Sequence, residues 1–200
     1  AALLGAGVMG RAQAMAIASE LDNLKDVRLY DIYRDKAEAW AEEMIEITGL
    51  PIRVVDSSEE AIRDADLVAP TTLVSVRDSY ILADWIKPGA LLTNISDNDY
   101  TFGAVQKCDK IVIDGMKQFG IPVTLGKMKE AGLLNPDDTF RIGAVVNGNA
   151  PGRERDDETI FFSALGMGIH DLMVGNMVYL RAKEKGIGTP LKLWETPYWV

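Results

Sequence analysis

The chain is poor in the side chains that bind metals or form covalent links. Its 200 residues include one cysteine, Cys108, and one histidine, His170. A disulfide framework or a structural zinc site needs several such side chains, so we expect neither a disulfide nor a bound metal. We also expect no Cys–His nucleophile pair, with Cys108 an ordinary thiol and His170 a structural or surface residue.

Basic clusters and long apolar runs are also missing. Acidic residues outnumber basic ones, 30 against 21, and the formal net charge is −9. Without a run rich in Lys and Arg, neither nucleic acid nor an anionic membrane is an expected partner. The apolar runs are shorter than the ~20 residues that span a bilayer, and no signal-peptide pattern is visible. The sequence therefore predicts a cytoplasmic protein, with 48% hydrophobic residues to build a globular core.

Short apolar runs alternate with amphipathic stretches from residue 1 to about residue 114. The runs are rich in Val, Ile and Leu, as in strands buried on both faces, and they span residues 1–4, 27–31, 52–56, 66–70, 90–95 and 110–114. Helices are predicted over 8–21 and 34–47, and a third begins where Ser57 or Ser58 can cap it. Apolar residues of the second helix share one face: Ala37, Trp40, Ala41, Met44 and Ile47. The predicted fold class is α/β, with a Rossmann-type doubly wound parallel sheet.

A glycine-rich motif joins the first predicted strand to the first helix. Residues 5–10 have the sequence GAGVMG, which matches G-x-G-x-x-G. Gly5 allows a tight turn, Gly7 lets a pyrophosphate approach, and Gly10 lets the helix pack closely on the strand. Asp31 ends the next strand, and this context makes the motif evidence for dinucleotide binding. The alternative is a glycine-rich turn in a Rossmann-like domain that binds no cofactor.

Asp31 also predicts which dinucleotide is bound. Its carboxylate would accept hydrogen bonds from ribose hydroxyls and repel a 2′-phosphate, so NAD(H) is predicted over NADP(H). Arg34 weakens this preference, because a nearby arginine can bind a 2′-phosphate. Val8, Met9 and Ile32 adjoin these groups, and we include them, with Arg34, in the predicted cofactor site.

Polar residues follow further predicted strands, where ligands gather in doubly wound sheets. Hydroxyls at Thr71, Thr72 and Ser75 follow the fourth strand, and they either line the cofactor cleft or cap the next turn. Residues 94–99 (NISDND) follow the fifth strand and contain two carboxylates. They form either a functional site or a surface turn.

The pattern changes after residue 114. Residues 120–140 are predicted as loop with one short helix, 148–157 as a polar turn, and 159–162 as a strand. The clearest helix is predicted over 168–185, with an apolar stripe formed by Ile169, Leu172, Met173, Met177 and Leu180.

These patterns divide the chain into a Rossmann domain over 1–150 and a C-terminal segment over 151–200. The chain opens directly in a buried-strand pattern, so we expect the natural protein to have an N-terminal domain that this chain lacks. We expect the C-terminal segment to pack on the Rossmann domain and to return to that second domain.

Five segments carry patterns that extend over nearly the whole chain. They are GAGVMGRAQ, ADLVAPTT, KPGALLTNISDND, GRERDDETIFFSALGMGIHDL and VYLRAKEKGIG. Together they resemble the ornithine cyclodeaminase/mu-crystallin family, and the last two are the most specific because Rossmann domains at large lack them. The resemblance implies an NAD(P)-dependent protein that transfers hydride between an amino-acid Cα and nicotinamide, with an imine as the other form of the substrate.

The resemblance also implies roles for single residues. Thr72 lies near the nicotinamide end of the cofactor, and so do Leu165 and Gly166. Asp99, five residues after Asn94, takes the position of the family's catalytic carboxylate.

Two features leave this alignment open. Counting from Pro88-Gly89 places Asn98, rather than Asp99, at the catalytic position. The small residues that the family has after Asn94 are Ser96-Asp97-Asn98 here, and its T-A-T is Pro70-Thr71-Thr72. These departures are more similar to the amino-acid dehydrogenase and opine-type synthase branches than to the ornithine cyclodeaminases.

The leading hypothesis is an NAD(H)-dependent oxidoreductase acting on the Cα–N bond of an amino acid or its imine. One alternative is an ornithine or lysine cyclodeaminase, a lyase that reduces and reoxidises its NAD within one turnover. The other is a non-catalytic protein that holds a cofactor or ligand. The resemblance further implies a homodimer in the full-length protein.

Overall fold

The computed structural model describes residues 1–74, 78–192 and 194–196, and these fall into two compact units. The first unit is Ala1–Leu165, and the second begins at Gly166. The first unit extends beyond residue 150, where the sequence pattern placed a boundary, because residues 160–163 form a strand of its sheet.

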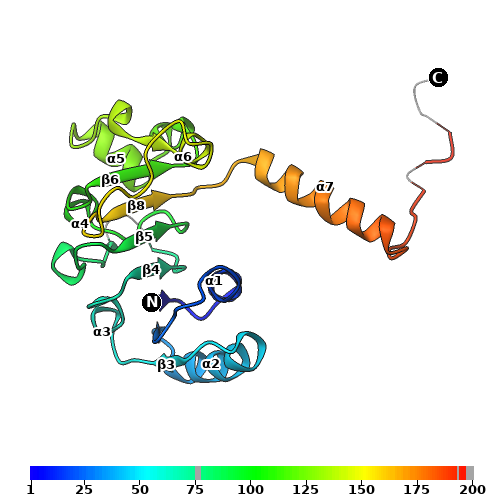
Figure 1. Ribbon diagram of the computed structural model, residues 1–200, viewed down its shortest axis with the longest axis horizontal. Helices are drawn as coiled ribbons and strands as arrows, with labels where there is room; N and C mark the ends of the chain where they lie inside the picture. The colour runs from blue at the N-terminus through cyan, green and yellow to red at the C-terminus, as the bar shows by residue number, and fades with distance from the viewer. Residues whose placement is uncertain (75–77, 193, 197–200) are drawn as a thin grey trace. The chain divides into compact units, whose positions relative to one another are not determined.

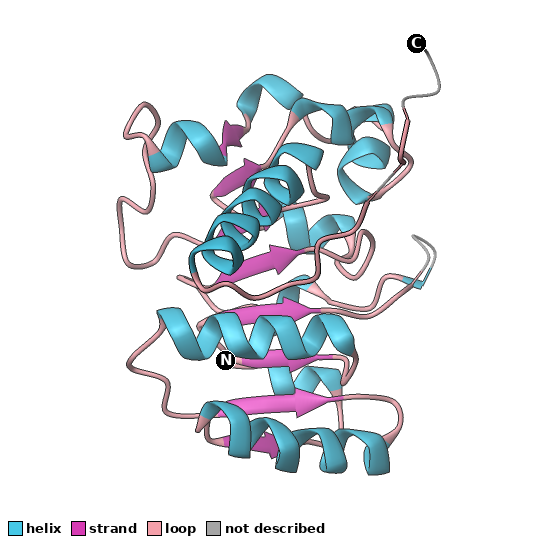
Figure 2. Cartoon of the chain, turned by 90° about the vertical axis from the view of Figure 1, so that its right-hand side faces the viewer, coloured by secondary structure: helices cyan, strands magenta, loops and turns pink. Residues whose placement is uncertain are grey.

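A parallel sheet forms the centre of the first unit (Figures 1 and 2). Within the described residues it has eight strands, in the order β3-β2-β1-β4-β5-β8-β6-β7. The strands are β1 (Ala2–Leu4), β2 (Val27–Tyr30), β3 (Ile52–Val54), β4 (Leu67–Pro70), β5 (Leu91–Asn94), β6 (Lys110–Ile113), β7 (Phe140–Arg141) and β8 (Ile160–Ser163). All predicted strands are present with slightly different ends. The two-residue strand β7 was not predicted.

Helices cover both faces of this sheet. Strand side chains alternate between faces: Leu3 and Leu29 belong to a core with helices α1 (Val8–Glu20) and α2 (Arg34–Thr48). Leu4 and Leu92 belong to a second core, with α3 (Ser58–Ile62) and α4 (Phe102–Gln106). This arrangement confirms the doubly wound α/β fold.

The predicted helix details are confirmed in part. The buried face of α2 consists of Ala37, Trp40, Ala41 and Met44. Ile47 was expected on this face but is 52% exposed and lies in the last turn of the helix. The cap of α3 is Ser57, whose Oγ accepts from the backbone N–H of Glu60 at 3.1 Å.

The region after β6 holds more structure than the one short helix that the sequence predicted. Besides α5 (Thr124–Glu130) it contains the 3₁₀ turns η3 (Met116–Gly120) and η4 (Pro136–Asp138), followed by β7 and α6 (Ile142–Val146). A further 3₁₀ turn, η2 (Ala83–Trp85), lies between β4 and β5. These elements are short, so the periodicity of apolar residues gives little signal for them.

Strand register brings the functional candidates to one edge of the sheet. Leu4 at the end of β1 is paired with Tyr30 on one side and Pro70 on the other. The residues that follow these strand ends, among them Asp31 and Thr71, therefore lie beside the glycine-rich turn. Parallel sheets bind ligands at this carboxyl edge.

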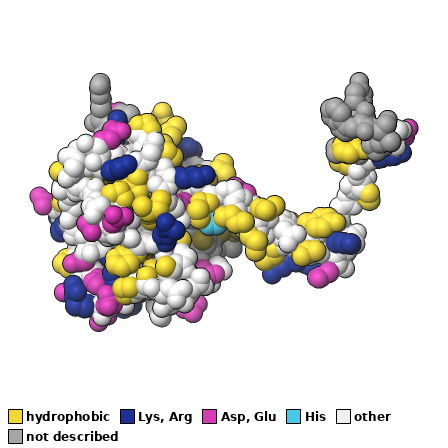
Figure 3. All heavy atoms as spheres, turned by 90° about the horizontal axis from the view of Figure 1, so that it is seen from above, with side chains coloured by type: hydrophobic (Ala, Val, Ile, Leu, Met, Phe, Trp, Pro, Cys, Tyr) yellow, Lys and Arg dark blue, Asp and Glu magenta, His cyan; other side chains and the backbone are white. Residues whose placement is uncertain are grey.

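The second unit contains helix α7 (Gly168–Glu184), none of whose residues is buried. Apolar side chains lie along this helix (Figure 3); they include Ile169, Leu172, Met173, Met177 and Leu180. Every helix in the described part of the chain is too short or too polar to cross a membrane. The cytoplasmic location stays a prediction.

Candidate functional site

The GAGVMG turn between β1 and α1 uses its glycines in two different ways. Gly5 has a φ of +103°, and a Cβ there would lie 2.8 Å from Thr71 Oγ1. A Cβ on Gly10 would lie 2.3 Å from the carbonyl oxygen of Gly5. Both positions therefore need glycine for the packing of the turn itself.

Gly7 is different, because a Cβ there would meet nothing within 4 Å. Its φ of −105° is accessible to any residue, so neither packing nor backbone strain in the protein explains this glycine. Gly7 is also the N-cap of α1 and provides no side-chain cap, which leaves N–H groups of the first turn for another acceptor. A phosphate group approaching this turn would explain both features.

Asp31 ties the turn to the start of α2. Its Oδ2 accepts from the backbone N–H of Ala6 at 2.7 Å, and its Oδ1 accepts from that of Tyr33 at 3.0 Å. An ionised carboxylate can accept about four hydrogen bonds, so Asp31 keeps acceptor capacity on both oxygens. The side chain is half-buried and lines a pocket, as a ligand for ribose hydroxyls must.

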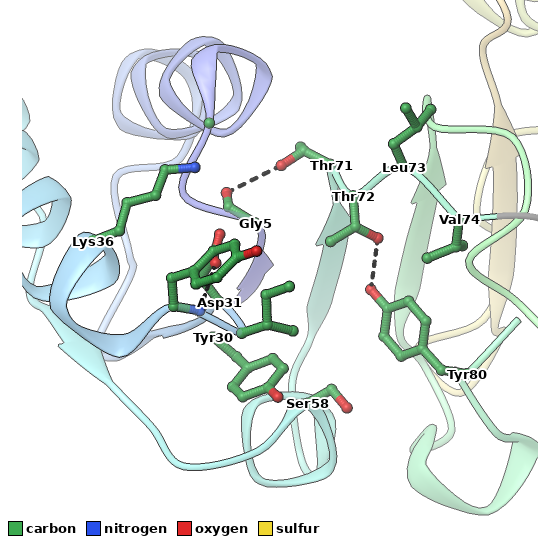
Figure 4. A pocket seen from close by; sticks show the side chains of 13 residues that line it. Gly5, Tyr30, Asp31, Lys36, Ser58, Thr71, Thr72, Leu73, Val74 and Tyr80 are labelled. Atoms are coloured by element: carbon green, nitrogen blue, oxygen red, sulfur yellow. Dashed lines mark hydrogen bonds between the residues drawn. The ribbon is translucent and has the colours of Figure 1, made fainter. Parts of the chain in front are cut away.

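Among the described residues, two neighbouring pockets of about 480 Å³ and about 240 Å³ share part of their lining. The larger pocket lies at the carboxyl edge between β2 and β4 (Figure 4). Its lining combines the glycine turn, the end of β2, the start of α2 and the segment after β4. The residues are Gly5, Gly7, Tyr30, Asp31, Ile32, Tyr33, Lys36, Ser58, Thr71, Thr72, Leu73, Val74 and Tyr80.

The basic residue of this pocket is Lys36, which the sequence analysis did not consider. Arg34, which it did consider, is absent from the lining. Its guanidinium donates to Glu38 Oε1 at 2.8 Å and to Asp56, and these acids hold it outside the pocket. Lys36 extends over the pocket toward the glycine turn (Figure 4). Lys36 lies two positions after Arg34 on the same helix, and this spacing turns the two side chains to different sides of it.

Several predicted cofactor residues are not part of the lining of the larger pocket. Val8 is 83% exposed and lines neither of the two pockets described here. Leu165 ends the first unit and also lines neither, and Gly166 belongs to the second unit. Met9 lines the smaller pocket. Ser75 lies outside the described residues.

The smaller pocket, of about 240 Å³, lies beside the larger one and shares Thr71, Thr72 and Leu73 with it. Its remaining lining comes from Met9 on α1 and from the segment after β5. This segment contributes Ile95, Ser96 and Asp97. An elongated ligand that begins at Asp31 and passes the glycine turn would therefore end near residues 95–97.

Thr71 and Thr72 have internal partners as well as pocket surface. The Thr71 hydroxyl donates to the carbonyls of Leu4 at 3.0 Å and Gly5 at 3.1 Å, which fixes the glycine turn. The Thr72 hydroxyl donates to Asp99 Oδ1 and lies 3.1 Å from the Tyr80 hydroxyl. The two alternatives for these hydroxyls, lining a cleft and securing a turn, therefore both apply.

Asp99 is fully buried behind the smaller pocket and lines neither pocket. Its two carboxyl oxygens accept from Thr72 Oγ1 and Ser96 Oγ. Burial raises the pKa of Asp99 above its ordinary value, and hydrogen bonds from Ser96, Thr72 and Tyr80 oppose that rise. A raised pKa makes this carboxylate a stronger proton acceptor than an ordinary aspartate.

The neighbouring candidates have different surroundings. Asp97 has a φ of +75°, lines the smaller pocket, and is held by its carbonyl, which accepts from Thr124 Oγ1 at 2.8 Å. Asn98 is half-buried and donates from Nδ2 to the carbonyl of Val74 at 3.3 Å. Among the three, Asp99 is the buried carboxyl with a raised pKa.

Tyr80 is a site residue that the sequence analysis missed. Its hydroxyl points toward Thr72 from the far side of the larger pocket (Figure 4). Burial and the nearby Asp99 raise the pKa of the Tyr80 phenol, so it stays protonated. The residue follows a stretch without regular periodicity, and no motif in the sequence marked it.

Cys108 and His170 line neither pocket. Burial raises the pKa of the Cys108 thiol to about 12, which keeps it protonated and unreactive. His170 lies exposed on α7 in the second unit. Across the described ranges, no group of three or more His, Cys, Asp or Glu side chains is arranged to hold a metal ion.

Comparison with known proteins gives a match to the ornithine cyclodeaminase/mu-crystallin family over residues 1–186. The N-((2S)-2-amino-2-carboxyethyl)-L-glutamate dehydrogenase of Staphylococcus aureus is 28% identical over 198 residues, which cover 96% of this chain and 57% of the relative. The Delta(1)-pyrroline-2-carboxylate reductase of Bacillus cereus is 25% identical, with coverage of 95% and 59%.

A solved structure of the Delta(1)-pyrroline-2-carboxylate reductase of Thermococcus litoralis, in complex with NADH and L-proline, has the same fold. It is 27% identical, with a TM-score of 0.83, over 94% of this chain and 59% of that one. The chain therefore spans less than two thirds of the length of these relatives.

Proposed function

Because the chain belongs to the ornithine cyclodeaminase/mu-crystallin family, we propose that it binds NAD(H) and acts on the Cα–N bond of an amino acid or its imine. The single observation that supports this most strongly is the junction of two pockets at Thr72, with Asp31 in one and the buried Asp99 behind the other. The relatives reinforce it, since their names describe dehydrogenases and reductases of amino or imino acids.

The larger pocket suits the adenosine half of the cofactor. The free acceptor capacity of Asp31 suits ribose hydroxyls, and the open space at Gly7 suits the pyrophosphate. The nicotinamide half would then reach the smaller pocket, between Met9 and the 95–97 segment. Ser75, Val8, Leu165 and Gly166 stay predictions as cofactor contacts.

Asp99 is the residue that we assign to proton transfer. Bound NAD⁺ would accept a hydride from the amino-acid Cα, which converts the amine into an imine. The amine must first lose a proton, and the raised pKa of Asp99 makes its carboxylate a fitting acceptor. Thr72 and Ser96 hold both carboxyl oxygens in place.

Asp99→Asn tests this assignment in the natural protein that contains this chain. The substitution keeps the size of the side chain and removes the base, so turnover should fall by about 10²–10⁴-fold, while NADH affinity stays unchanged. Asp97→Asn is the matched variant, because the same chemical change is made on the neighbouring acid. A loss of turnover in Asp97→Asn with normal turnover in Asp99→Asn would show that the alignment through Asn94 is wrong.

The absorbance of NADH separates this function from the cyclodeaminase alternative. An oxidoreductase consumes or produces NADH in step with its product, whereas a cyclodeaminase returns the cofactor to its starting state in each turnover. Product formation without a net change in NADH would favour the cyclodeaminase. Cofactor binding without any product would favour the non-catalytic alternative.

We further propose that the full-length protein is a homodimer. The apolar residues along α7 are exposed in the second unit, and apolar surface of this kind marks an interface. We propose that residues 151–200 supply part of the contact with a second domain. A monodisperse monomer of the full-length protein in light scattering would contradict the dimer.

A further inference from the structure

The buried position of Asp99 raises a question about proton access. A base must exchange its proton with the substrate, yet Asp99 is fully buried and lines neither pocket. If the proposed function holds, the proton must pass through a neighbouring group. The hydroxyls of Thr72 and Ser96 contact Asp99 and also line the smaller pocket.

The hydrogen-bond partners of Thr72 determine which acceptor its hydroxyl proton faces. A hydroxyl has one proton and two lone pairs. The Thr72 proton is donated to Asp99 Oδ1, so Thr72 accepts in its contact of 3.1 Å with the Tyr80 hydroxyl, whose single proton is shared between Thr72 and Asp99 (Figure 4). One lone pair of Thr72 then remains, and Thr72 lines both pockets.

Ser96 is less suited to carry a proton between the smaller pocket and Asp99. Its hydroxyl proton has two acceptors, Asp99 Oδ2 and the carbonyl of Pro70 at 3.3 Å. Among the described residues, none donates a hydrogen bond to the Ser96 hydroxyl as Tyr80 does to the Thr72 hydroxyl. Ser96 therefore holds the second carboxyl oxygen of Asp99 in place, and the Ser96 hydroxyl proton is divided between two acceptors.

We propose that the Thr72 hydroxyl relays a proton between the smaller pocket and Asp99, and that Tyr80 positions Thr72 for this transfer. The inference rests on the proposed function. An ammonium group in the pocket gives its proton to the free lone pair of Thr72, and the original Thr72 proton moves to Asp99 Oδ1. The products are a neutral amine, an unchanged hydroxyl and a protonated carboxyl, and imine reduction uses the same steps in reverse. Electrons move only with the hydride.

The test compares Thr72→Val, which removes the hydroxyl but keeps the shape, with Thr72→Ser, which keeps the hydroxyl. Thr93→Val is the matched control, because Thr93 donates to the carbonyl of Val68 at 3.4 Å and lines neither pocket. The measurements are kcat, KM, NADH affinity and the solvent deuterium isotope effect on kcat, in the natural protein that contains this chain.

Thr72→Val should lower kcat at least about tenfold, short of the ~10²–10⁴-fold loss expected without the base itself. Its solvent isotope effect should rise because proton transfer becomes slower, while NADH affinity should change by a smaller factor than kcat. Thr93→Val should behave like the unmodified protein, and Thr72→Ser should lower kcat less than Thr72→Val does, because it keeps the hydroxyl. If Thr72→Val does not fold, Tyr80→Phe serves instead, since it must also lower kcat and raise the isotope effect.

Normal kcat and isotope effect in Thr72→Val, with Asp99→Asn inactive, would overturn the relay and leave the proposed function intact. The same conclusion would follow if Ser96→Ala showed the predicted changes and Thr72→Val did not. Full turnover in Asp99→Asn would instead remove Asp99 from the proposed function, and the relay with it.

Discussion

At the scale of residues, the GAGVMG turn has some glycines that serve the packing of the turn and another that serves ligand binding. Gly7→Ala should leave thermal stability unchanged, because the new Cβ meets no protein atom. It should weaken NADH binding about tenfold or more, the order that one added methyl group costs in a close-fitting site. Fluorescence titration with NADH and thermal unfolding measure the two effects.

Gly10→Ala is the matched variant in the same turn. Its Cβ would lie 2.3 Å from the carbonyl oxygen of Gly5, and overpacking of this kind costs about 1–3 kcal/mol of stability. A stable Gly10→Ala protein, or a Gly7→Ala protein that binds NADH normally, would contradict these roles.

Asp31 should set the cofactor preference. A charge-assisted hydrogen bond is worth roughly 1.5–3 kcal/mol, or about tenfold or more in affinity, so NADH should bind more tightly than NADPH. Asp31→Ser should narrow this gap. Lys36→Met should weaken NADPH binding, because Lys36 is the cation of the pocket, and Lys25→Met on the exposed surface serves as the control. Equal affinities in the unmodified protein would rule out the preference.

The raised pKa of Asp99 predicts how stability depends on pH. Folding favours the protonated carboxyl, so its contribution is complete below the unfolded pKa of about 3.9 and is lost as pH rises through the higher folded pKa. Asp99→Asn removes this loss of stability, because an amide does not ionise. The variant should therefore be at least as stable as the unmodified protein at neutral pH, with an advantage that shrinks on acidification. Calorimetric unfolding across this range would contradict the prediction if the advantage grew at low pH.

The sequence predicted some of these residues better than others. Gly5, Gly10 and Asp31 belong to one continuous strand-turn-helix unit, whose local pattern determines its geometry. Tyr80 and Lys36 depend on how separate segments meet, which no local pattern encodes. Arg34 was included by its closeness in sequence, but its acidic neighbours Glu38 and Asp56 hold it outside the pocket.

At the scale of elements, the position of β8 is the main feature that the sequence could not predict. The strand itself was visible as an apolar run, but it lies between β5 and β6 and pairs with both. Periodicity indicates that a strand exists, but it does not indicate which strands lie beside it. The first unit extends past residue 150, where the sequence pattern placed a boundary, since β8 completes its sheet.

The core position of β8 leads to a stability prediction. Phe161 is fully buried and packs edge-to-face on Tyr100, with ring centroids 5.2 Å apart. Phe161→Ala should therefore cost about 3–5 kcal/mol of unfolding free energy. Leu172→Ala on the exposed face of α7 should change it within about 0.5 kcal/mol in this chain. Denaturant unfolding measures both, and similar losses for the two variants would contradict the placement of β8.

At the scale of the whole molecule, the carboxyl edge of the sheet gathers residues from segments far apart in the chain. The register of β1, β2 and β4 brings the glycine turn, Asp31 and Thr72 together, and the segment after β5 adds Asp99 behind them. A dinucleotide running along this edge would place its redox end beside a proton acceptor. That arrangement is the physical basis of the proposed oxidoreductase.

The most direct measurement follows the hydride itself. The natural protein that contains this chain is incubated with NADH deuterated at its transferable position and with cyclic imines, or with 2-oxo acids and amines, and the products are analysed by mass spectrometry. We predict one deuterium at the product Cα and an equal loss of NADH, both greatly reduced in Asp99→Asn. Products without deuterium, or unchanged NADH with every substrate, would contradict hydride transfer at the Cα–N bond.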